Sequence, residues 1–167
     1  QTEEDKKRFC QLGALSERVM VVGNMKYDMP TCESDIAWGK AFKRTLKGRT
    51  VIIGASTHPQ EEAYLIQALV ELKKFQPDLL FVIAPRHPER REEIKALANS
   101  HQFRLSNRTE TQSIPQACDI YLLDTLGELK RFYSVSDIAF VGGSLVEHGG
   151  HNMLEPISLD VPVITGP

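Results

Sequence analysis

The sequence predicts an α/β fold in which a doubly wound, Rossmann-like parallel sheet is covered by helices on both faces. Short apolar runs alternate along most of the chain with longer segments of helical periodicity. The short runs are apolar at successive positions rather than at every second one, which is typical of strands buried on both faces. With 167 residues, of which 41% are hydrophobic, the chain can form one substantial core, so we expect a single domain over residues 1–167.

The strands are predicted from runs of β-branched and aliphatic residues that end in small or polar ones. A β-branched run at 18–24 ends in Gly-Asn. The runs that we interpret as strands cover, in chain order, 50–56, 79–85, 103–106 (the weakest), 119–124, 137–143 and 161–165.

The helices are predicted from the segments between these strands, at 36–46, 59–75, 88–101, 125–136 and 151–159. In 59–75 a proline and two acidic residues precede apolar positions at near-helical spacing. Residues 26–35 contain a proline and many polar residues, and we interpret them as a linker.

Both ends of the chain are expected to continue into further structure. Residues 2–14 are polar and helix-like, so residues 1–17 are interpreted as a tail or linker from an amino-terminal domain. A parallel strand such as 161–165 is normally followed by a covering helix. We therefore expect carboxy-terminal helices beyond Pro167.

Composition argues against several classes of protein. The net charge of −2 and the pI of about 6.2 provide no basic field for nucleic acid. Three widely separated cysteines, Cys10, Cys32 and Cys118, form no CxxC pair, so neither a disulfide framework nor a zinc site is expected, and a reducing compartment fits better. No apolar run approaches the ~18 residues of a membrane span, and the charged start is no signal peptide. We expect a soluble, cytosolic chain.

Polar residues collect after the carboxyl ends of the predicted strands, where ligands bind in doubly wound sheets. They are Ser56, Thr57, His58, Arg86, His87, Glu89, Thr125, Gly127, Glu128 and the segment 142–156. The opposite ends of the strands, such as Gly48-Arg49 and 76–78, resemble ordinary turns. This one-sided distribution predicts a site at the carboxyl edge of the sheet.

Each of these residues also has a purely structural interpretation. Glycine pairs in such loops often allow a positive φ or tight packing. His58 and His101 can be ordinary surface histidines. Glu128 can be a helix-start residue that interacts favourably with the helix dipole. Residues 142–150 do not fit G-x-G-x-x-G, and no P-loop lysine follows. His148, His151 and Glu155 lack metal-ligand spacing, so we expect no metal and no cofactor.

The combination in GGSLVEHGGHNMLEP, residues 142–156, favours a nucleotide. Glycine allows a phosphate to approach backbone N–H groups, and a helix N-terminus adds unpaired donors. If a helix begins near His151, Asn152 and Glu155 share one face of its first turn. A carboxylate there can accept hydrogen bonds from two adjacent ribose hydroxyls. The segment therefore predicts a holder for a nucleoside monophosphate.

Four motifs together resemble one enzyme family. They are GASTH (54–58), APRHPER (84–90), LLDTLGEL (122–129) and FVGGSLVEHGGHNMLEP (140–156), and the resemblance covers residues 18–167. The chain resembles the Kdo (3-deoxy-D-manno-octulosonic acid) transferases of Gram-negative lipopolysaccharide synthesis. The resemblance implies the carboxy-terminal half of a GT-B glycosyltransferase. Family members transfer Kdo from CMP-Kdo to a lipid A precursor at the cytoplasmic face of the inner membrane.

The resemblance also implies the residues that contact the nucleotide-sugar, which are Arg86, His87, Leu126, Gly127, Glu128, Gly143, Ser144, Asn152, Met153, Leu154 and Glu155. Residues 126–128 are expected to act largely through backbone groups. Leu126 stands where the family pattern has methionine, and Met153 where proline is frequent. The general base of the family would lie upstream of Gln1, so no catalytic residue is expected in this chain.

Two other functions remain open from the sequence. A GT-B-fold sugar-nucleotide epimerase would share the architecture and the ribose-binding acid. A non-catalytic nucleotide-binding or interaction domain is the second alternative. The family resemblance further implies that the acceptor and the membrane surface are contacted by the amino-terminal domain and not by this chain.

Overall fold

The structure, a computed structural model, describes residues 1–24 and 33–167. The chain divides into two compact units, Gln1–Pro30 and Thr31–Pro167. In the first unit the expected helix is present as α1 (Glu3–Gln11), which Thr2 caps through the backbone N–H of Asp5. A 3₁₀ turn, η1 (Ser16–Arg18), follows. The β-branched run at 18–24 forms no strand. The expected linker at 26–35 lies outside the described residues as far as Cys32, and its last three residues belong to helix α2.

The second unit contains a parallel sheet of six strands in the order β3-β4-β2-β1-β5-β6. The strands are β1 (Val51–Thr57), β2 (Leu80–Pro85), β3 (Leu105–Asn107), β4 (Ile120–Leu122), β5 (Ile138–Val141) and β6 (Val163–Ile164). Each overlaps a run predicted from the sequence, and β1 and β3 extend one residue beyond it. The prediction of a parallel sheet is confirmed, as is the assignment of the 103–106 segment to a short strand.

Helices follow the strands as expected, but two are shorter than predicted. The helices are α2 (Glu33–Thr45), α3 (Glu61–Phe75), the 3₁₀ turn η3 (Pro88–Arg90), α4 (Arg91–Ser100), α5 (Leu129–Tyr133) and α6 (Leu154–Ile157). The expectation that a helix begins near His151 is wrong. The N–H of His151 donates to the carbonyl of Gly142, and Gly149 and Gly150 have positive φ, so the chain stays on the sheet edge until α6 begins at Leu154.

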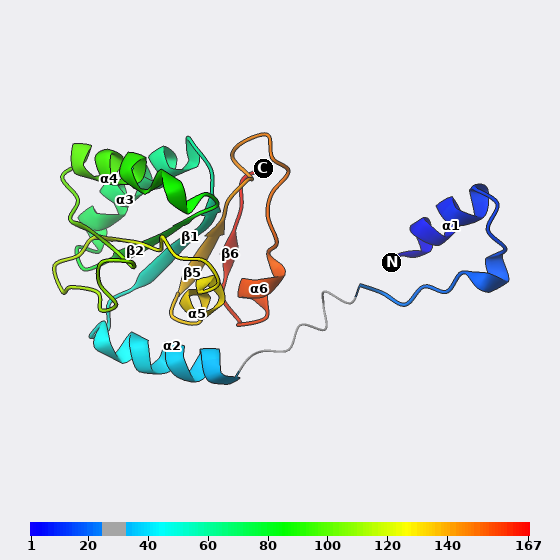
Figure 1. Cartoon of the computed structure of the whole chain (residues 1–167), viewed down its shortest axis with the longest axis horizontal. Coiled ribbons are helices and arrows are strands. Elements are labelled where there is room, and N and C mark those ends of the chain that lie inside the picture. The colour runs from blue at the N-terminus through cyan, green and yellow to red at the C-terminus, as the bar shows by residue number, and fades with distance from the viewer. Residues whose placement is uncertain (25–32) are drawn as a thin grey trace. The chain divides into compact units, whose positions relative to one another are not determined.

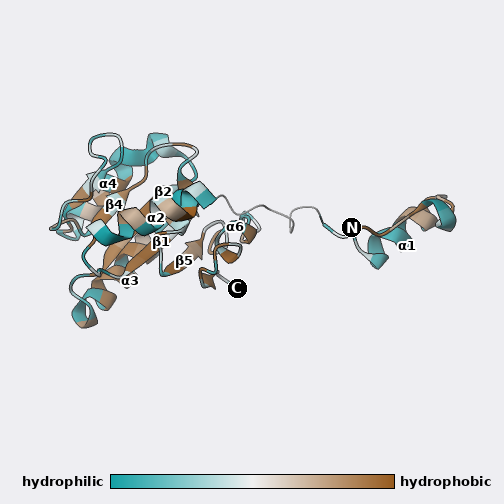
Figure 2. Ribbon diagram, turned by 90° about the horizontal axis from the view of Figure 1, so that it is seen from below, coloured by the Kyte–Doolittle hydropathy of each residue, from teal (hydrophilic) through white to brown (hydrophobic). Residues whose placement is uncertain are grey.

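Helices cover both faces of the sheet (Figure 1), and hydrophobic side chains pack against each face. On one face, Ile66 of α3 and Ile94 of α4 join a buried cluster with Ile83 and Leu122. On the other face, a second cluster includes Phe132 of α5, with Trp38 and Phe42 of α2 packed against it. Figure 2 shows the strands in hydrophobic colours and mixed colours on α2. The doubly wound architecture predicted from the sequence is therefore confirmed.

The sheet has a topological switch point between β1 and β5. β1 pairs with β2 on one side and with β5 on the other. From β1 the chain continues to β2 on one side, and later strands β5 and β6 are added on the opposite side, so the connections run in opposite directions from this point. In such sheets the crevice beyond the carboxyl ends at the switch point is the preferred ligand site. The loops that meet there are those of His58 and Gly142.

The opposite edge of the sheet contains a buried cation that the sequence analysis did not single out. Arg49 is 7% exposed, and its guanidinium donates to the carbonyls of Asp78 (2.8 Å), Leu79 (3.3 Å) and Cys118 (2.6 Å). The turns expected at this edge are therefore tied together by one arginine. Among the described residues, no helix has the length and hydrophobicity needed to cross a bilayer.

Candidate functional site

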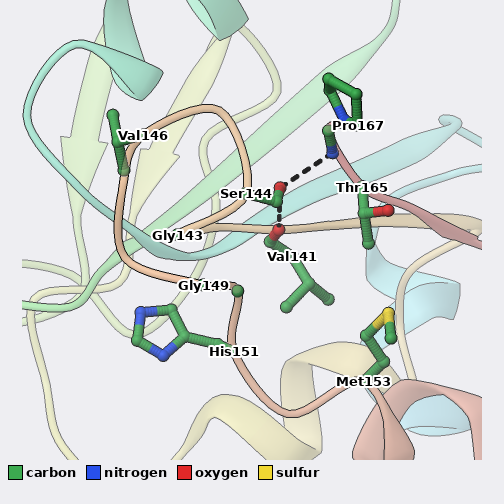
Figure 3. A pocket seen from close by; sticks show the side chains of 11 residues that line it. Val141, Gly143, Ser144, Val146, Gly149, His151, Met153, Thr165 and Pro167 are labelled. Atoms are coloured by element: carbon green, nitrogen blue, oxygen red, sulfur yellow. Dashed lines mark hydrogen bonds between the residues drawn. The ribbon is translucent and has the colours of Figure 1, made fainter.

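Two of the cavities at the carboxyl edge of the sheet contain residues that the sequence analysis expected to contact the ligand. The first, of about 310 Å³, is called here the glycine-loop cavity and is lined by Val141, Gly143, Ser144, Val146, Gly149, Gly150, His151, Met153, Thr165, Gly166 and Pro167 (Figure 3). The second, of about 150 Å³, is called the Arg86 cavity and is lined by Ser56, Ala84, Pro85, Arg86, Leu123, Thr125, Leu126, Gly127 and Leu129. Six of the residues expected to contact the ligand line one or other of these cavities: Arg86, Leu126, Gly127, Gly143, Ser144 and Met153.

Arg86 provides a positive charge at this edge. Its backbone N–H donates to the carbonyl of Thr57 at 2.9 Å, which fixes the loop after β2 to the end of β1. Its side chain is exposed and makes no hydrogen bond or ion pair with the part of the chain that the structure describes. The guanidinium therefore has its donors available for an anion, which arginine binds in a charge-assisted manner.

Glu128 is half-buried, and its side chain is held by neighbouring residues. Its carboxylate accepts hydrogen bonds from Arg108 at 3.0 and 2.7 Å and from the hydroxyl of Thr125 at 2.6 Å. The Arg108 guanidinium lowers the pKa of Glu128 below its ordinary value, against the opposing effect of burial. These bonds occupy the carboxylate of Glu128. A ligand beside residues 126–128 would therefore meet their backbone groups and not this side chain. Gly127, with φ of 79°, gives that backbone a conformation that other residues rarely adopt.

Glu61 lies at the carboxyl edge of the sheet, and the sequence analysis did not single it out. Its side chain is completely buried, and its carboxylate accepts four backbone N–H groups, from His58 (2.9 Å), Gly143 (2.9 Å), Ser144 (3.1 Å) and Leu145 (3.0 Å). Burial alone raises the pKa of Glu61, but the N–H donors outweigh it and leave the pKa below its usual value. In the sequence, the acidic start of α3 indicates only the beginning of a helix.

The glycine loop is therefore bound to an internal anion. We expected its N–H groups to face a phosphate, and at Gly143 and Ser144 they face Glu61 instead. Gly142 allows this packing, since a Cβ there would lie 2.4 Å from the carbonyl oxygen of Ser56 and 2.8 Å from Glu61. The hydroxyl of Ser144 is also occupied, donating to Val141 and accepting from Gly166 at 2.9 Å each (Figure 3). Gly143 and Ser144 thus shape the cavity wall.

Three histidines meet beside these loops. His58 is 6% exposed, so its interpretation as a surface histidine is wrong, whereas His101 is exposed as expected. The Nε2 atoms of His58 and His151 lie 2.7 Å apart, and the ring of His148 stacks on that of His58 at a centroid distance of 4.1 Å. His87 lies edge-on to His58 at 6.2 Å and contacts Glu89. Burial lowers the pKa of both His58 and His151.

Residues 152–155 span the start of α6. The side-chain oxygen of Asn152 accepts the N–H of Leu154 at 3.0 Å, so Asn152 lies before the helix and binds the N–H of its first residue. Met153 lines the glycine-loop cavity. Glu155 lies in the first turn, and its carboxylate makes no hydrogen bond or ion pair with the described residues. Burial, and then the charge of Glu155, raise the pKa of Tyr133.

No cation site is formed by these groups. Within residues 1–24 and 33–167, no three His, Cys, Asp or Glu side chains are arranged to hold a metal ion. The edge instead offers a free guanidinium, imidazoles, a partly exposed carboxylate and glycine-shaped cavities. This set suits an anionic ligand that also carries hydroxyl groups.

Comparison with known proteins defines the class. Residues 42–167 match the family "Glycosyl transferases group 1". The chain therefore belongs to the group 1 glycosyl transferases, and its six-stranded sheet is that of the carboxy-terminal half of a GT-B enzyme.

Within this class, the chain is similar to Kdo transferases, which confirms the resemblance noted in the sequence. It is 38% identical over 161 residues to the 3-deoxy-D-manno-octulosonic acid transferase of Haemophilus influenzae and 36% identical over 171 residues to that of Bordetella pertussis. These alignments cover 96% and 100% of this chain, but only 38% and 39% of the two relatives. The chain thus spans about two fifths of the length of these relatives.

A solved structure has the same fold. The C-terminal CMP-Kdo binding domain of WaaA from Acinetobacter baumannii matches with a TM-score of 0.76 and 37% identity, over 81% of this chain and 72% of that one.

Proposed function

We propose that this chain is the donor-binding domain of an enzyme that transfers Kdo from CMP-Kdo to a lipid A precursor. The observation that carries the proposal is the similarity in sequence and fold to a domain described as binding CMP-Kdo, with 37% identity and a TM-score of 0.76. The free guanidinium and the two cavities at the switch point provide a place for such a ligand. The comparisons favour this function over the epimerase and the non-catalytic alternatives.

The nucleotide contacts follow from the site. Arg86 would bind the phosphate, because its guanidinium has no partner among the described residues. The backbone of 126–128 would contact the nucleotide, since the carboxylate of Glu128 is occupied by Arg108. Glu155 would accept the ribose hydroxyls, and Asn152 and Met153 would lie beside it. His87 remains a proposed contact at an exposed position after β2.

The chemistry assigned to this domain is stabilisation of the leaving group. Displacement at the anomeric carbon releases CMP, and the bond to the phosphate oxygen breaks as negative charge grows on it. A preorganised cation such as Arg86 stabilises that charge more in the transition state than in the ground state. The base that deprotonates the acceptor hydroxyl would belong to another domain of the enzyme.

Contacts with the acceptor and with the cytoplasmic face of the inner membrane would also belong to that domain. We accordingly propose that residues 1–17 connect the two domains and that the enzyme acts without a metal cofactor.

Complementation tests the function of the whole enzyme. Expressed in a bacterium that lacks its own Kdo transferase, the full reading frame should restore Kdo on lipid A, measured by mass spectrometry of the extracted lipid. Well-expressed protein that leaves lipid A without Kdo would contradict the proposal.

A further inference from the structure

The histidine cluster, defined as His58, His148 and His151, combines two loops at the switch point. His58 follows β1, and the other two follow β5. The rings of His58 and His151 are nearly parallel, with an interplanar angle of 6° and their Nε2 atoms 2.7 Å apart. The ring of His148 stacks on the ring of His58, with an interplanar angle of 20° and a centroid distance of 4.1 Å. His58 and His148 also line a cavity of about 240 Å³ with Glu147. His58 thus contacts both other imidazoles of the cluster.

The short contact between His58 and His151 determines how many protons the pair can hold. A hydrogen bond between two imidazole nitrogens needs one N–H donor and one lone pair. With both rings neutral, the donor carries its proton on Nε2 and the acceptor carries its proton on Nδ1. The donor ring can gain a second proton at Nδ1 and keep the bond, which then becomes charge-assisted. A further proton on the acceptor ring would break the bond. The pair is therefore neutral or carries a single positive charge.

Several charged groups act on this pair. Arg86 lowers the pKa of His151, and His148 lowers that of both members. Glu61, beneath the loops, raises the pKa of both, but its carboxylate is shared among four N–H donors. His87 opposes protonation of His58 and is itself in contact with Glu89. Glu147 lines the adjoining cavity. Burial is the largest influence, and it favours the neutral pair.

We propose that the histidine cluster, together with Arg86, is a proton-linked binding site for a phosphate group. This inference rests on the proposed function for the identity of that phosphate, which would be the one in the nucleotide. An anion placed near Arg86 and His151 reverses the balance, because its charge favours the protonated pair. Binding would then take up a proton at neutral pH, and release of CMP would return it.

Linkage gives the sign of the pH dependence. The pKa of the pair is low in the free protein and higher in the complex. The affinity for CMP therefore rises as pH falls through the pKa of the complex, and it stops rising below the pKa of the free protein. The second pKa of a phosphate monoester is about 6, so a window from about pH 7 to about pH 8.5 reports the protein rather than the ligand. Within this window CMP should bind more weakly as pH rises.

The experiment is calorimetric titration of CMP into the chain in two buffers with different ionisation enthalpies. The difference between the two heats gives the number of protons taken up. The original chain should take up a measurable fraction of a proton, and His151→Gln should take up clearly less, because glutamine keeps an N–H at the Nε2 position but does not titrate, which leaves His58 as the only imidazole of the pair. His101→Gln, at an exposed histidine that ends α4, is the matched control and should behave as the original chain. Circular dichroism checks that each variant is folded.

The outcomes separate this inference from the proposed function. CMP binding without proton uptake, or with uptake that is undiminished in folded His151→Gln, overturns the inference and leaves the function standing. If CMP does not bind, inorganic phosphate is titrated while the histidine C–H resonances are followed by NMR. Shifts of His58 and His151 then support the anion site and contradict the nucleotide, and no shift contradicts both. Should His151→Gln unfold, the same resonances in the original chain decide, since CMP must raise the apparent pKa of the pair.

Discussion

The carboxylate of Glu61 accepts the backbone N–H of Gly143 at 2.9 Å, and this bond crosses the switch point of the sheet. The same side chain also holds the N–H of His58, so one buried residue of α3 joins the loop after β1 to the loop after β5. These loops contain the histidine cluster and the glycine-loop cavity. Glu61 therefore positions the groups that we propose to contact the ligand, without facing the ligand itself.

Substituting Glu61 should destabilise the fold and loosen the site together. In Glu61→Gln one carboxylate oxygen becomes an NH₂ group that meets N–H donors, leaving buried donors unsatisfied. We expect a loss of about 2–4 kcal/mol in the free energy of unfolding, measured by urea denaturation. Glu71→Gln, at an exposed position on the same helix, is the control and should change stability by less than about 0.5 kcal/mol. Equal stability of the two variants would contradict the role given to Glu61.

The contribution of Glu61 to stability should depend on pH in one direction. Because the pKa of Glu61 is lower in the folded protein, its contribution is fully present above the unfolded pKa of about 4.3 and is lost as pH falls through the folded value. The difference in unfolding free energy between the original chain and Glu61→Gln should therefore be constant near neutral pH and shrink in acid. A difference that stays constant down to acid denaturation would argue against this assignment.

Arg86→Ala should weaken CMP binding by about tenfold or more, because a charge-assisted hydrogen bond to phosphate contributes ~1.5–3 kcal/mol. Cytidine, which lacks the phosphate, should bind nearly as before. Arg91→Ala is the matched control, since Arg91 is also exposed and begins the neighbouring α4. Calorimetry with both ligands provides the comparison. Equal losses for cytidine and CMP would place Arg86 at the base or in packing.

Glu155→Gln tests the ribose assignment. The change keeps the shape of the side chain and one acceptor oxygen but removes the charge that favours two hydroxyl donors. CMP affinity should fall clearly, whereas 2′,3′-dideoxy-CMP should be affected much less. The melting temperature should barely move, because the helix-dipole contribution of a first-turn acid is only ~0.3–1 kcal/mol. A loss of stability with unchanged binding of both nucleotides would make Glu155 a helix-start residue only.

Periodicity and apolar runs were sufficient to predict the sheet, because strands buried on both faces are apolar along their whole length. The glycine-rich segment after β5 was correctly expected at the carboxyl edge. The start of α6 was misplaced, since the bond from His151 to the carbonyl of Gly142 depends on a loop that doubles back on the sheet. Sequence spacing alone does not reveal that return.

Three buried polar residues show why the rest could not be predicted. Glu61, His58 and Arg49 each lie in a stretch that matches an ordinary signal, namely a helix start, a loop and a turn. Their partners are distant in the chain, with Glu61 bonded to Gly143 and His58 to His151. Burial of such groups follows from these long-range pairings. Glycine at 142 and 143 is consistent with a positive φ at Gly143 and with close packing at Gly142. The sequence does not show that the group packed against them is the carboxylate of Glu61.

The central claim is that this chain binds a cytidine nucleotide donor, and the most direct test is calorimetric titration of the chain with CMP, UMP and AMP under identical conditions. We predict that CMP binds most tightly and that UMP and AMP bind more weakly. Equal curves for CMP and AMP, or binding of UMP in preference to CMP, would contradict it.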